Sequence, residues 1–312
     1  MVDTRPFETI CVVGAGYMGS QIGLLCAFRG FEVRLHDVSD DALNKAWQSI
    51  TQELDSWVKD NQISTEEKKA IIGRIQASRG IEEAASDADL VIEAIPERLE
   101  NKRDVFKKLD RVCESHTILA TNSSSIRVSK MEDATRRPDR VLNTHFYTMP
   151  WRRSIVELMR GTETSDETVE RVWLFASALG LTPLMVLKES TGFIFNRVWR
   201  AIKKETLHLV DEGVASFEDV DRAWMILYGA SVGPFGMMDK IGLDVVRDIE
   251  MVYYQESGDE SDRPPKLLLD KIERGELGVK TGRGFYTYPD PAYLDPAWLT
   301  QNHLHLFDKP EM

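Results

Sequence analysis

A glycine-rich loop, Gly14-Ala-Gly16-Tyr17-Met18-Gly19, constrains the fold of this chain more than any other feature. The β-branched run Thr9–Val13 before it predicts a buried strand, and the apolar stretch after it, which stops at Gly30, predicts a helix. Glycine at the three positions permits a tight turn, close approach of the backbone to a phosphate, and close packing of the helix on the strand. The loop therefore predicts a strand–turn–helix unit with free backbone N–H groups at the start of the helix.

An acidic residue at the end of the next strand predicts what this loop binds. Alternating apolar residues from Phe31 to Leu35 predict a second strand that ends at Asp37. A carboxylate there would accept hydrogen bonds from ribose hydroxyls and repel a 2′-phosphate. The pattern favours NAD over NADP, with the dinucleotide held by Asp37 and by the loop residues Gly14, Gly16, Tyr17, Met18 and Gly19. The fingerprint alone leaves open FAD, or a glycine-rich turn without a nucleotide.

The order of the remaining segments predicts the fold class and the domains. Strand-like runs alternate with amphipathic stretches up to Glu189, and after it only helical spacing continues. We expect a Rossmann-like, doubly wound α/β domain over residues 1–188 and a mostly helical domain with a C-terminal tail over residues 189–312. Beyond the first two strands, the expected strands are 90–95, 117–121, 140–145, 155–159 and 181–187, and the expected helices include 40–58 and 64–72.

The composition argues against several classes of function. The net charge of −12 disfavours nucleic acid and anionic membranes, because both attract dense Lys and Arg. No apolar run approaches the roughly 20 residues of a membrane-spanning helix, and the first residues lack the pattern of a secretion signal. The three cysteines lack metal-site spacing and fit a reducing compartment, so neither a metal site nor a disulfide is expected. We expect a cytoplasmic protein that binds a small molecule.

Several separated motifs between Met1 and about Tyr288 resemble those of the 3-hydroxyacyl-CoA dehydrogenase family. The run from Thr121 to Ile126 resembles the family's (S/T)N(T/S)SS strand end, and His145 with Glu157 resembles its His–Glu pair. The resemblance implies NAD-dependent, reversible oxidation of a 3-hydroxyacyl-CoA to the 3-oxoacyl-CoA in fatty acid metabolism. It also implies a homodimer formed through the helical domain. Further matching segments begin at Ser190, Gly233, Gly242 and Lys280.

The resemblance assigns roles to the strand-end residues that their chemistry can perform. An imidazole titrates near neutral pH, so His145 would take the hydroxyl proton and return it in the reverse reaction. Glu157 would orient one ring nitrogen and stabilise the imidazolium. Ser124 and Asn196 would donate hydrogen bonds to the substrate oxygen, with a turn residue and a helix cap as the structural alternatives.

Other residues are expected toward the ends of the two ligands. Asn122 would lie at the nicotinamide end of the cofactor, together with Glu97 and Lys102 of a segment similar to the family's EAxxE…K. Lys68 and Lys69 resemble basic residues of the family's helical arm that meet the coenzyme A phosphates, and Lys102 is a further candidate cation. A solvated helix face is the alternative for Lys68 and Lys69.

The segment after His145 departs from the family's F(F/W)NP pattern. Thr148 stands in place of Asn, Met149 in place of Pro, and Trp151-Arg152-Arg153 follows. Arg152 and Arg153 would grip a substrate carboxylate, or they are surface charges on a turn. The alternative functions are therefore a dehydrogenase of a free hydroxy acid, similar to the carnitine and gulonate dehydrogenases, and a catalytically idle protein similar to lambda-crystallin.

Overall fold

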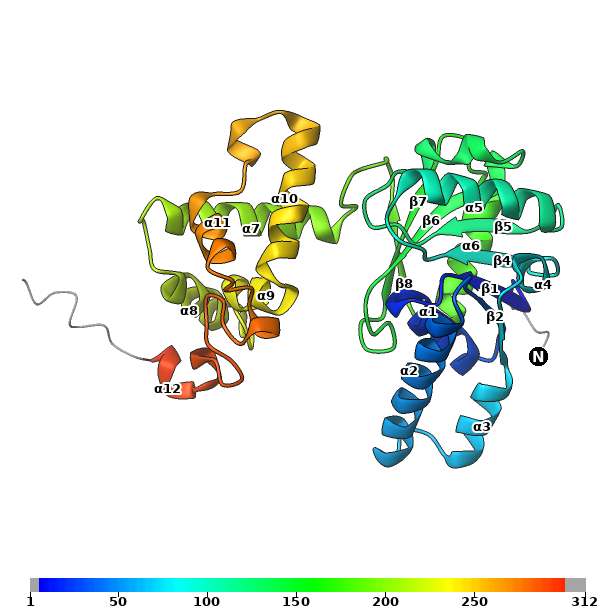
Figure 1. The fold of residues 1–312 in the computed structure, drawn as a ribbon, viewed down its shortest axis with the longest axis horizontal. Helices are drawn as coiled ribbons and strands as arrows, with labels where there is room; N and C mark the ends of the chain where they lie inside the picture. Colours follow the sequence, from blue (N-terminus) through cyan, green and yellow to red (C-terminus); the bar gives the residue numbers. More distant parts are fainter. Residues whose placement is uncertain (1–5, 301–312) are drawn as a thin grey trace, which may run out of the picture. The chain divides into compact units, whose positions relative to one another are not determined.

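The structure, a computed structural model, describes residues 6–300. The chain divides into two compact units, Met1–Ile194 and Phe195–Met312 (Figure 1). The last part of the predicted C-terminal tail, residues 301–312, lies outside the described residues. The assignment of residues 1–188 to the cofactor and of 189–312 to substrate and dimerisation stays a prediction.

The first unit is built on one eight-stranded sheet in the order β3-β2-β1-β4-β5-β6-β7-β8. Neighbouring strands pair in parallel except β6 and β7, which are antiparallel. The strand order reverses direction at β1, which lies between β2 and β4, and ligands of such sheets bind at this switch point. The strands are β1 Thr9–Val13, β2 Glu32–His36, β3 Ile75–Ser78, β4 Leu90–Glu93, β5 Ile118–Thr121, β6 Val141–Phe146, β7 Ile155–Arg160 and β8 Thr182–Val186.

Helices cover both faces of this sheet, which confirms the predicted doubly wound fold. Along β1, Ile10 and Val12 join the core cluster that contains residues of α1, whereas Cys11 and Val13 join the cluster that contains Phe106 of α5. Alternate residues of a strand point to opposite faces, so each face has its own apolar core. The helices are α1 Tyr17–Phe28, α2 Asp40–Lys59, α3 Thr65–Gly73, α4 Ile81–Ala85, α5 Leu99–Val112 and α6 Asp166–Ala178.

Helices α2 and α3 extend from the sheet as a pair (Figure 1). The hydroxyl of Ser39 caps α2 by accepting a hydrogen bond from Ala42 N. Ser64 and Glu67 form a capping box at the start of α3, in which each side chain accepts a backbone N–H of the other residue. The predicted ranges 40–58 and 64–72 agree closely with both helices, because helical spacing and the capping box at Ser64 are local signals. The predicted strands did not include β3, where Ile75 alone is buried and the next three residues are exposed or half-buried.

The second unit is helical, and its core contains buried carboxylates as well as apolar side chains. Asp221 accepts the backbone N–H groups of Phe235 and Gly236 at the start of α9, and Asp239 accepts those of Phe285 and Tyr286. Asp221 therefore joins α8 to α9, and Asp239 joins α9 to the non-helical segment at Phe285 and Tyr286. The helices are α7 Phe195–Asp211, α8 Phe217–Tyr228, α9 Pro234–Ile241, α10 Leu243–Ser257, α11 Lys266–Glu273 and α12 Pro296–Leu299.

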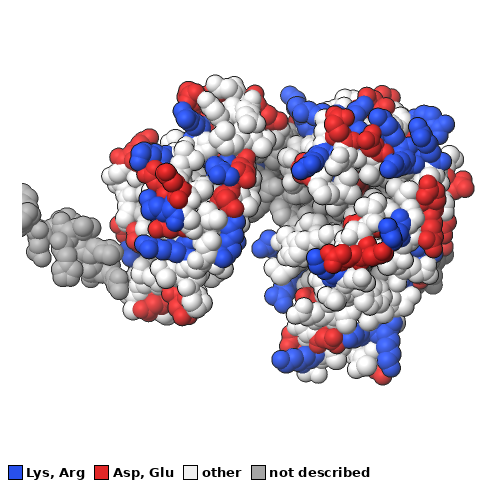
Figure 2. Space-filling model, viewed as in Figure 1, with Lys and Arg blue, Asp and Glu red and all other residues white. Residues whose placement is uncertain are grey.

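Charged side chains of both signs are interspersed on the visible face of each unit (Figure 2). Within residues 6–300, no helix has the length and hydropathy needed to cross a membrane. The same residues contain no cluster of three or more His, Cys, Asp or Glu side chains placed to hold a metal ion.

Candidate active site

The predicted cofactor-binding and acid–base residues that follow or end the parallel strands of the first unit collect at one edge of its sheet. In parallel strands the carboxyl ends lie at the same edge, and the glycine loop follows β1 there, as Asp37 follows β2 and Asn122 follows β5. His145 is the fifth of the six residues of β6, which runs parallel to β5. The topology therefore gathers residues that are more than a hundred positions apart in sequence.

The glycine loop has the geometry of a phosphate-binding turn. Gly14 has a φ of +106°, and a Cβ there would lie 2.7 Å from Ala94 O. A Cβ on Gly19 would overlap Gly14 O, whereas one on Gly16 would meet open space. Helix α1 begins at Tyr17 without a side-chain cap, so its first N–H groups remain for a ligand. These features fit a dinucleotide pyrophosphate at Gly16.

Asp37 holds this loop in place, a role that the sequence did not indicate. One carboxylate oxygen accepts a hydrogen bond from Ala15 N at 2.9 Å, and the other accepts one from Ser39 N at 2.9 Å. A carboxylate has about four acceptor positions, so these two bonds leave capacity for ribose hydroxyls. These remaining acceptor positions fit the ribose hydroxyls of NAD.

The His145–Glu157 pair is set by strand register. Antiparallel pairing of β6 with β7 places His145 opposite Glu157, with Nδ1 2.8 Å from Oε2. His145 is 6% exposed and Glu157 is fully buried. The carboxylate also accepts hydrogen bonds from the hydroxyl of Tyr147 at 2.9 Å and from Ile194 N at 2.9 Å. With Nδ1 bound to the carboxylate, the Nε2 atom of His145 is the nitrogen left for a substrate proton.

The turn after β5 is tied to β6 by two asparagines. The side-chain oxygen of Asn122 accepts a hydrogen bond from Phe146 N, and the side-chain amide of Asn143 donates one to Ser123 O, each at 2.8 Å. Ser124 is exposed at the tip of this turn. The hydrogen bonds of the neighbouring residues Asn122 and Ser123 therefore fix the position of Ser124, the predicted ligand of the substrate oxygen, relative to the strand that carries His145.

A buried ion-pair cluster supports the same turn from the other side. Lys102 is 1% exposed, and its ammonium lies 2.7 Å from Glu93 Oε1 and 3.2 Å from Glu97 Oε2. Glu97 accepts hydrogen bonds from the hydroxyls of Ser123 at 2.5 Å and Ser125 at 2.8 Å. Burial raises the pKa of Glu97, but Lys102 and these hydroxyls outweigh it and hold the pKa below its usual value.

This burial changes the interpretation of Lys102. Its ammonium already contacts two carboxylates and Ile95 O, so it has no exposed charge to offer a coenzyme A phosphate. The structure gives Lys102 a supporting role beneath the turn instead. Glu93 was the missed partner, and its signal was a charged residue at the end of an apolar strand, where charges are rare unless paired.

The remaining candidates belong to other elements of the chain. On α3, Lys68 forms an ion pair with Asp55 of α2, and Lys69 is exposed. Arg152 and Arg153 are exposed on a turn, where both backbone N–H groups donate to Met149 O. The guanidinium of Arg153 also donates to the hydroxyl of Thr148 at 2.9 Å. Asn196 is the second residue of α7, in the second unit.

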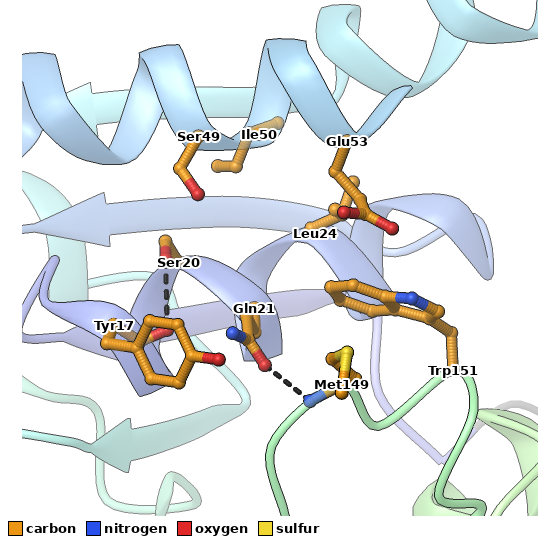
Figure 3. A pocket seen from close by; sticks show the side chains of 9 residues that line it. All are labelled: Tyr17, Ser20, Gln21, Leu24, Ser49, Ile50, Glu53, Met149 and Trp151. Atoms are coloured by element: carbon orange, nitrogen blue, oxygen red, sulfur yellow. Dashed lines mark hydrogen bonds between the residues drawn. The ribbon is translucent and has the colours of Figure 1, made fainter. Parts of the chain in front are cut away.

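The loop after β6, where the sequence departs from the family's F(F/W)NP pattern, closes one side of a pocket of about 160 Å³ (Figure 3). Met149 N donates to the side-chain oxygen of Gln21 on α1 at 2.6 Å. Trp151 packs edge-on against Trp57 of α2, with 5.3 Å between ring centroids. The sequence did not single out Gln21, whose contact joins residues 128 positions apart.

Comparisons with known proteins identify what this arrangement is similar to. The sequence model described as "3-hydroxyacyl-CoA dehydrogenase, NAD binding domain" matches residues 9–190, and that of the family's C-terminal domain matches residues 192–288. A probable 3-hydroxybutyryl-CoA dehydrogenase of Bacillus subtilis is 38% identical over 283 residues, which cover 91% of this chain and 98% of that protein.

Solved structures agree. The crystal structure of (S)-3-hydroxybutyryl-CoA dehydrogenase from Ralstonia eutropha has a TM-score of 0.85 and 34% identity, and the match covers 91% of this chain and all of that one. An NAD⁺-dependent 5-dehydrogenase of 5-formyl-3-hydroxy-2-methylpyridine 4-carboxylic acid is more distant. It has a TM-score of 0.71 and 28% identity, with 94% of this chain and 93% of that one covered.

Proposed function

The chain belongs to the 3-hydroxyacyl-CoA dehydrogenase family, and we propose that His145 and Glu157 perform the acid–base chemistry of its reaction. That reaction is the NAD-dependent oxidation of a 3-hydroxyacyl-CoA to the 3-oxoacyl-CoA. The observation that carries the proposal is the buried 2.8 Å contact between the two side chains at the switch-point edge of the sheet.

In this proposal, different residues of the first unit bind the cofactor, transfer the proton and orient the base. Gly16, the start of α1 and Asp37 hold the dinucleotide, which supplies the hydride acceptor when it is bound. His145 Nε2 takes the proton of the 3-hydroxyl group as the carbinol hydride leaves, so the alcohol loses two electrons and two hydrogens. Glu157 accepts the Nδ1 hydrogen bond and stabilises the imidazolium that forms.

Ser124 and Asn196 donate hydrogen bonds to the oxygen of the substrate in this proposal. Ser124 is exposed on its turn, and among the described residues its hydroxyl has no hydrogen-bond partner, which supports a role toward a ligand. Asn122 binds the nicotinamide end through its side-chain NH₂ group, because its oxygen is already used by Phe146 N. Lys69, and Lys68 beside it, contact the coenzyme A phosphates.

Replacing the base tests the assignment directly. We expect His145→Ala to lower kcat by roughly 10²–10⁴-fold, the usual contribution of positioned acid–base catalysis. Glu157→Gln should lose activity as well, while affinity for NAD stays near that of the unmodified protein in both variants. NADH absorbance measures turnover and fluorescence titration measures NAD binding. A His145→Ala variant with near-normal kcat would remove the dyad from the mechanism.

We propose a short 3-hydroxyacyl thioester as the substrate, since the similar proteins are named for 3-hydroxybutyryl-CoA. A panel of 3-hydroxyacyl thioesters of increasing chain length, with the matching free acids, tests this by NADH absorbance. The four-carbon thioester should give the highest kcat/KM. A free acid that turns over faster than every thioester would exclude the proposal.

A free hydroxy acid is the second candidate substrate. It is favoured by the structural similarity to a dehydrogenase of a pyridine carboxylic acid and by the exposed arginines beside the His145 strand. In that case Arg152→Ala or Arg153→Ala abolishes turnover of the free acid, because a bidentate guanidinium contact is lost. Arg247→Ala on α10, which removes an exposed guanidinium that pairs with its neighbour Asp248, is the matched control.

We further propose that the protein is a cytoplasmic homodimer. On α8 the adjacent apolar side chains of Ile226, Leu227 and Tyr228 are 59%, 79% and 72% exposed. Burying such a patch against a second copy would remove apolar surface from water. The cysteines, all buried free thiols, support a reducing compartment.

A further inference from the structure

A tyrosine hydroxyl shares the carboxylate oxygen that orients the catalytic histidine. Tyr147 lies one residue beyond the end of β6, and its hydroxyl donates to Glu157 Oε2 at 2.9 Å. His145 Nδ1 contacts the same oxygen at 2.8 Å. The Tyr147 and His145 rings are also adjacent, with 4.7 Å between their centroids. Glu157 Oε2 therefore receives two side-chain donors.

Tyr147 keeps its proton in this position. Burial, and then the negative charge of Glu157, raise the pKa of Tyr147 far above its usual range. The phenol is thus a neutral hydrogen-bond donor at every pH at which the reaction runs. A neutral donor withdraws negative charge from the carboxylate oxygen without adding a positive charge of its own.

We propose that Tyr147 is a positioning residue that weakens the basicity of His145 by drawing on the same oxygen of Glu157. The proposal rests on the proposed role of the His145–Glu157 pair. The imidazolium form of His145 is stabilised by the carboxylate charge that it faces, and a second donor on that oxygen reduces this stabilisation. The neutral ring, which is the form that accepts the substrate proton, is thereby available at lower pH.

Uncharged groups of the neighbouring segments pack against the pair. Across β7, Glu157 is in register with Leu184 of β8. The segment before α7 contributes the Phe193 ring, 4.9 Å from the His145 ring, and the backbone N–H of Ile194. Ile194 N donates to the other carboxylate oxygen, Oε1, so the hydroxyl of Tyr147 is the neutral donor that shares Oε2 with His145 Nδ1.

The variant Tyr147→Phe removes this hydroxyl and keeps the ring. In the oxidative direction, we expect the acidic limb of kcat/KM against pH to move upward by roughly half to one pH unit, a fraction of the value of a charged hydrogen bond. In the reductive direction, activity should persist to higher pH by the same amount. Tyr254→Phe is the matched control, since Tyr254 on α10 of the second unit also donates its hydroxyl to a glutamate, Glu260.

Titration of the His145 ring by NMR provides a readout that does not depend on turnover. Its signal is assigned by its loss in His145→Gln, and its midpoint should rise in Tyr147→Phe but not in Tyr254→Phe. An unchanged midpoint in a folded Tyr147→Phe variant would overturn the proposal. If the midpoint rises but His145→Gln retains activity, the effect of Tyr147 holds and the proposed role of the dyad fails, so the two outcomes are distinguishable.

Discussion

Glu157 and Glu97 differ in the side chains that surround their carboxylates. Glu157 accepts hydrogen bonds from His145, a tyrosine hydroxyl and a backbone N–H, whereas Glu97 faces the ammonium of Lys102. Neutral donors leave a carboxylate its net negative charge, so Glu157 can stabilise a protonated imidazole, and the hydroxyl of Tyr147 reduces this stabilisation without removing it. A carboxylate paired with a cation is suited to holding a turn. Their different surroundings match a chemical role for Glu157 and a structural one for Glu97.

Asp37 combines two functions that one variant can separate. We expect Asp37→Asn to keep one of its two backbone hydrogen bonds and lose the negative charge. Efficiency with NADP should therefore rise relative to NAD, because the repulsion of the 2′-phosphate is lost. Values of kcat/KM for both cofactors measure the change. Equal efficiency with NAD and NADP in the unmodified protein would show that Asp37 does not select the cofactor.

At the scale of elements, polar contacts centred on buried Lys102 connect helix α5 with the segments that follow strands β4 and β5. Lys102 on α5 holds Glu93 at the end of β4 and Glu97 beyond it, and Glu97 in turn holds the turn after β5. Because the interior has a low dielectric constant, such a cluster has a narrow range of allowed geometries. The position of Ser124 therefore depends on α5 as well as on its own strand.

Lys102→Met tests this dependence. Removing the ammonium leaves the fully buried carboxylate of Glu93 without its cation, and breaking a buried pair usually costs about 3–5 kcal/mol. We expect a lower free energy of unfolding in urea and a lower kcat, because the turn with Ser124 loses its support. Lys107→Met on the same helix is the control, since Lys107 is half exposed and pairs with Asp104 at the surface. Equal stability of the two variants would contradict the prediction.

In the second unit, Asp221 makes stability depend on pH. Burial is the main cause that raises its pKa to about 6 from 3.8. The folded state therefore binds the proton more tightly than the unfolded state, so this contribution is present below pH 3.8 and is lost as the pH rises through about 6. The full effect is about 3 kcal/mol.

Comparison with a variant isolates this contribution. Asp221→Asn cannot titrate, and it also loses one acceptor for the α9 N–H groups, so it should be less stable overall. The difference in unfolding free energy between the two proteins should shrink as the pH rises from 4 to 6. Urea unfolding followed by circular dichroism at several pH values measures it. A difference independent of pH would show that Asp221 does not titrate in this range.

At the scale of the whole molecule, the apolar residues of α8 are notable because packing within the second unit leaves them exposed to solvent. Leu227 is 79% exposed in the chain by itself. Leu227→Asp should convert a dimer to monomers in sedimentation velocity, because a charge at a buried interface is costly. Leu174→Asp on α6 of the first unit, where Leu174 is 49% exposed, is the control. A monomeric unmodified protein, or a dimer that Leu227→Asp leaves intact, would exclude this interface.

The sequence by itself determined the features that local patterns encode. The glycine loop, the β-branched strand before it and Asp37 predict the dinucleotide site at the carboxyl ends of the strands. They do so because turn geometry and strand alternation are set by residues close together in sequence. The capping box at Ser64 predicted the start of α3 for the same reason. His145 and Glu157 were found as a pair because the motif preserves their spacing along two consecutive strands.

Only the tertiary structure decided which side chains meet across elements. Periodicity shows which face of an element is buried but not which residue of another element lies opposite. The burial of Lys102 between two carboxylates, the contact of Gln21 with Met149 and the second donor on Glu157 Oε2 all depend on that packing. Lys102 is an example. The sequence makes it a candidate phosphate ligand, whereas in the fold it is buried and pairs with the carboxylates that support the turn after β5.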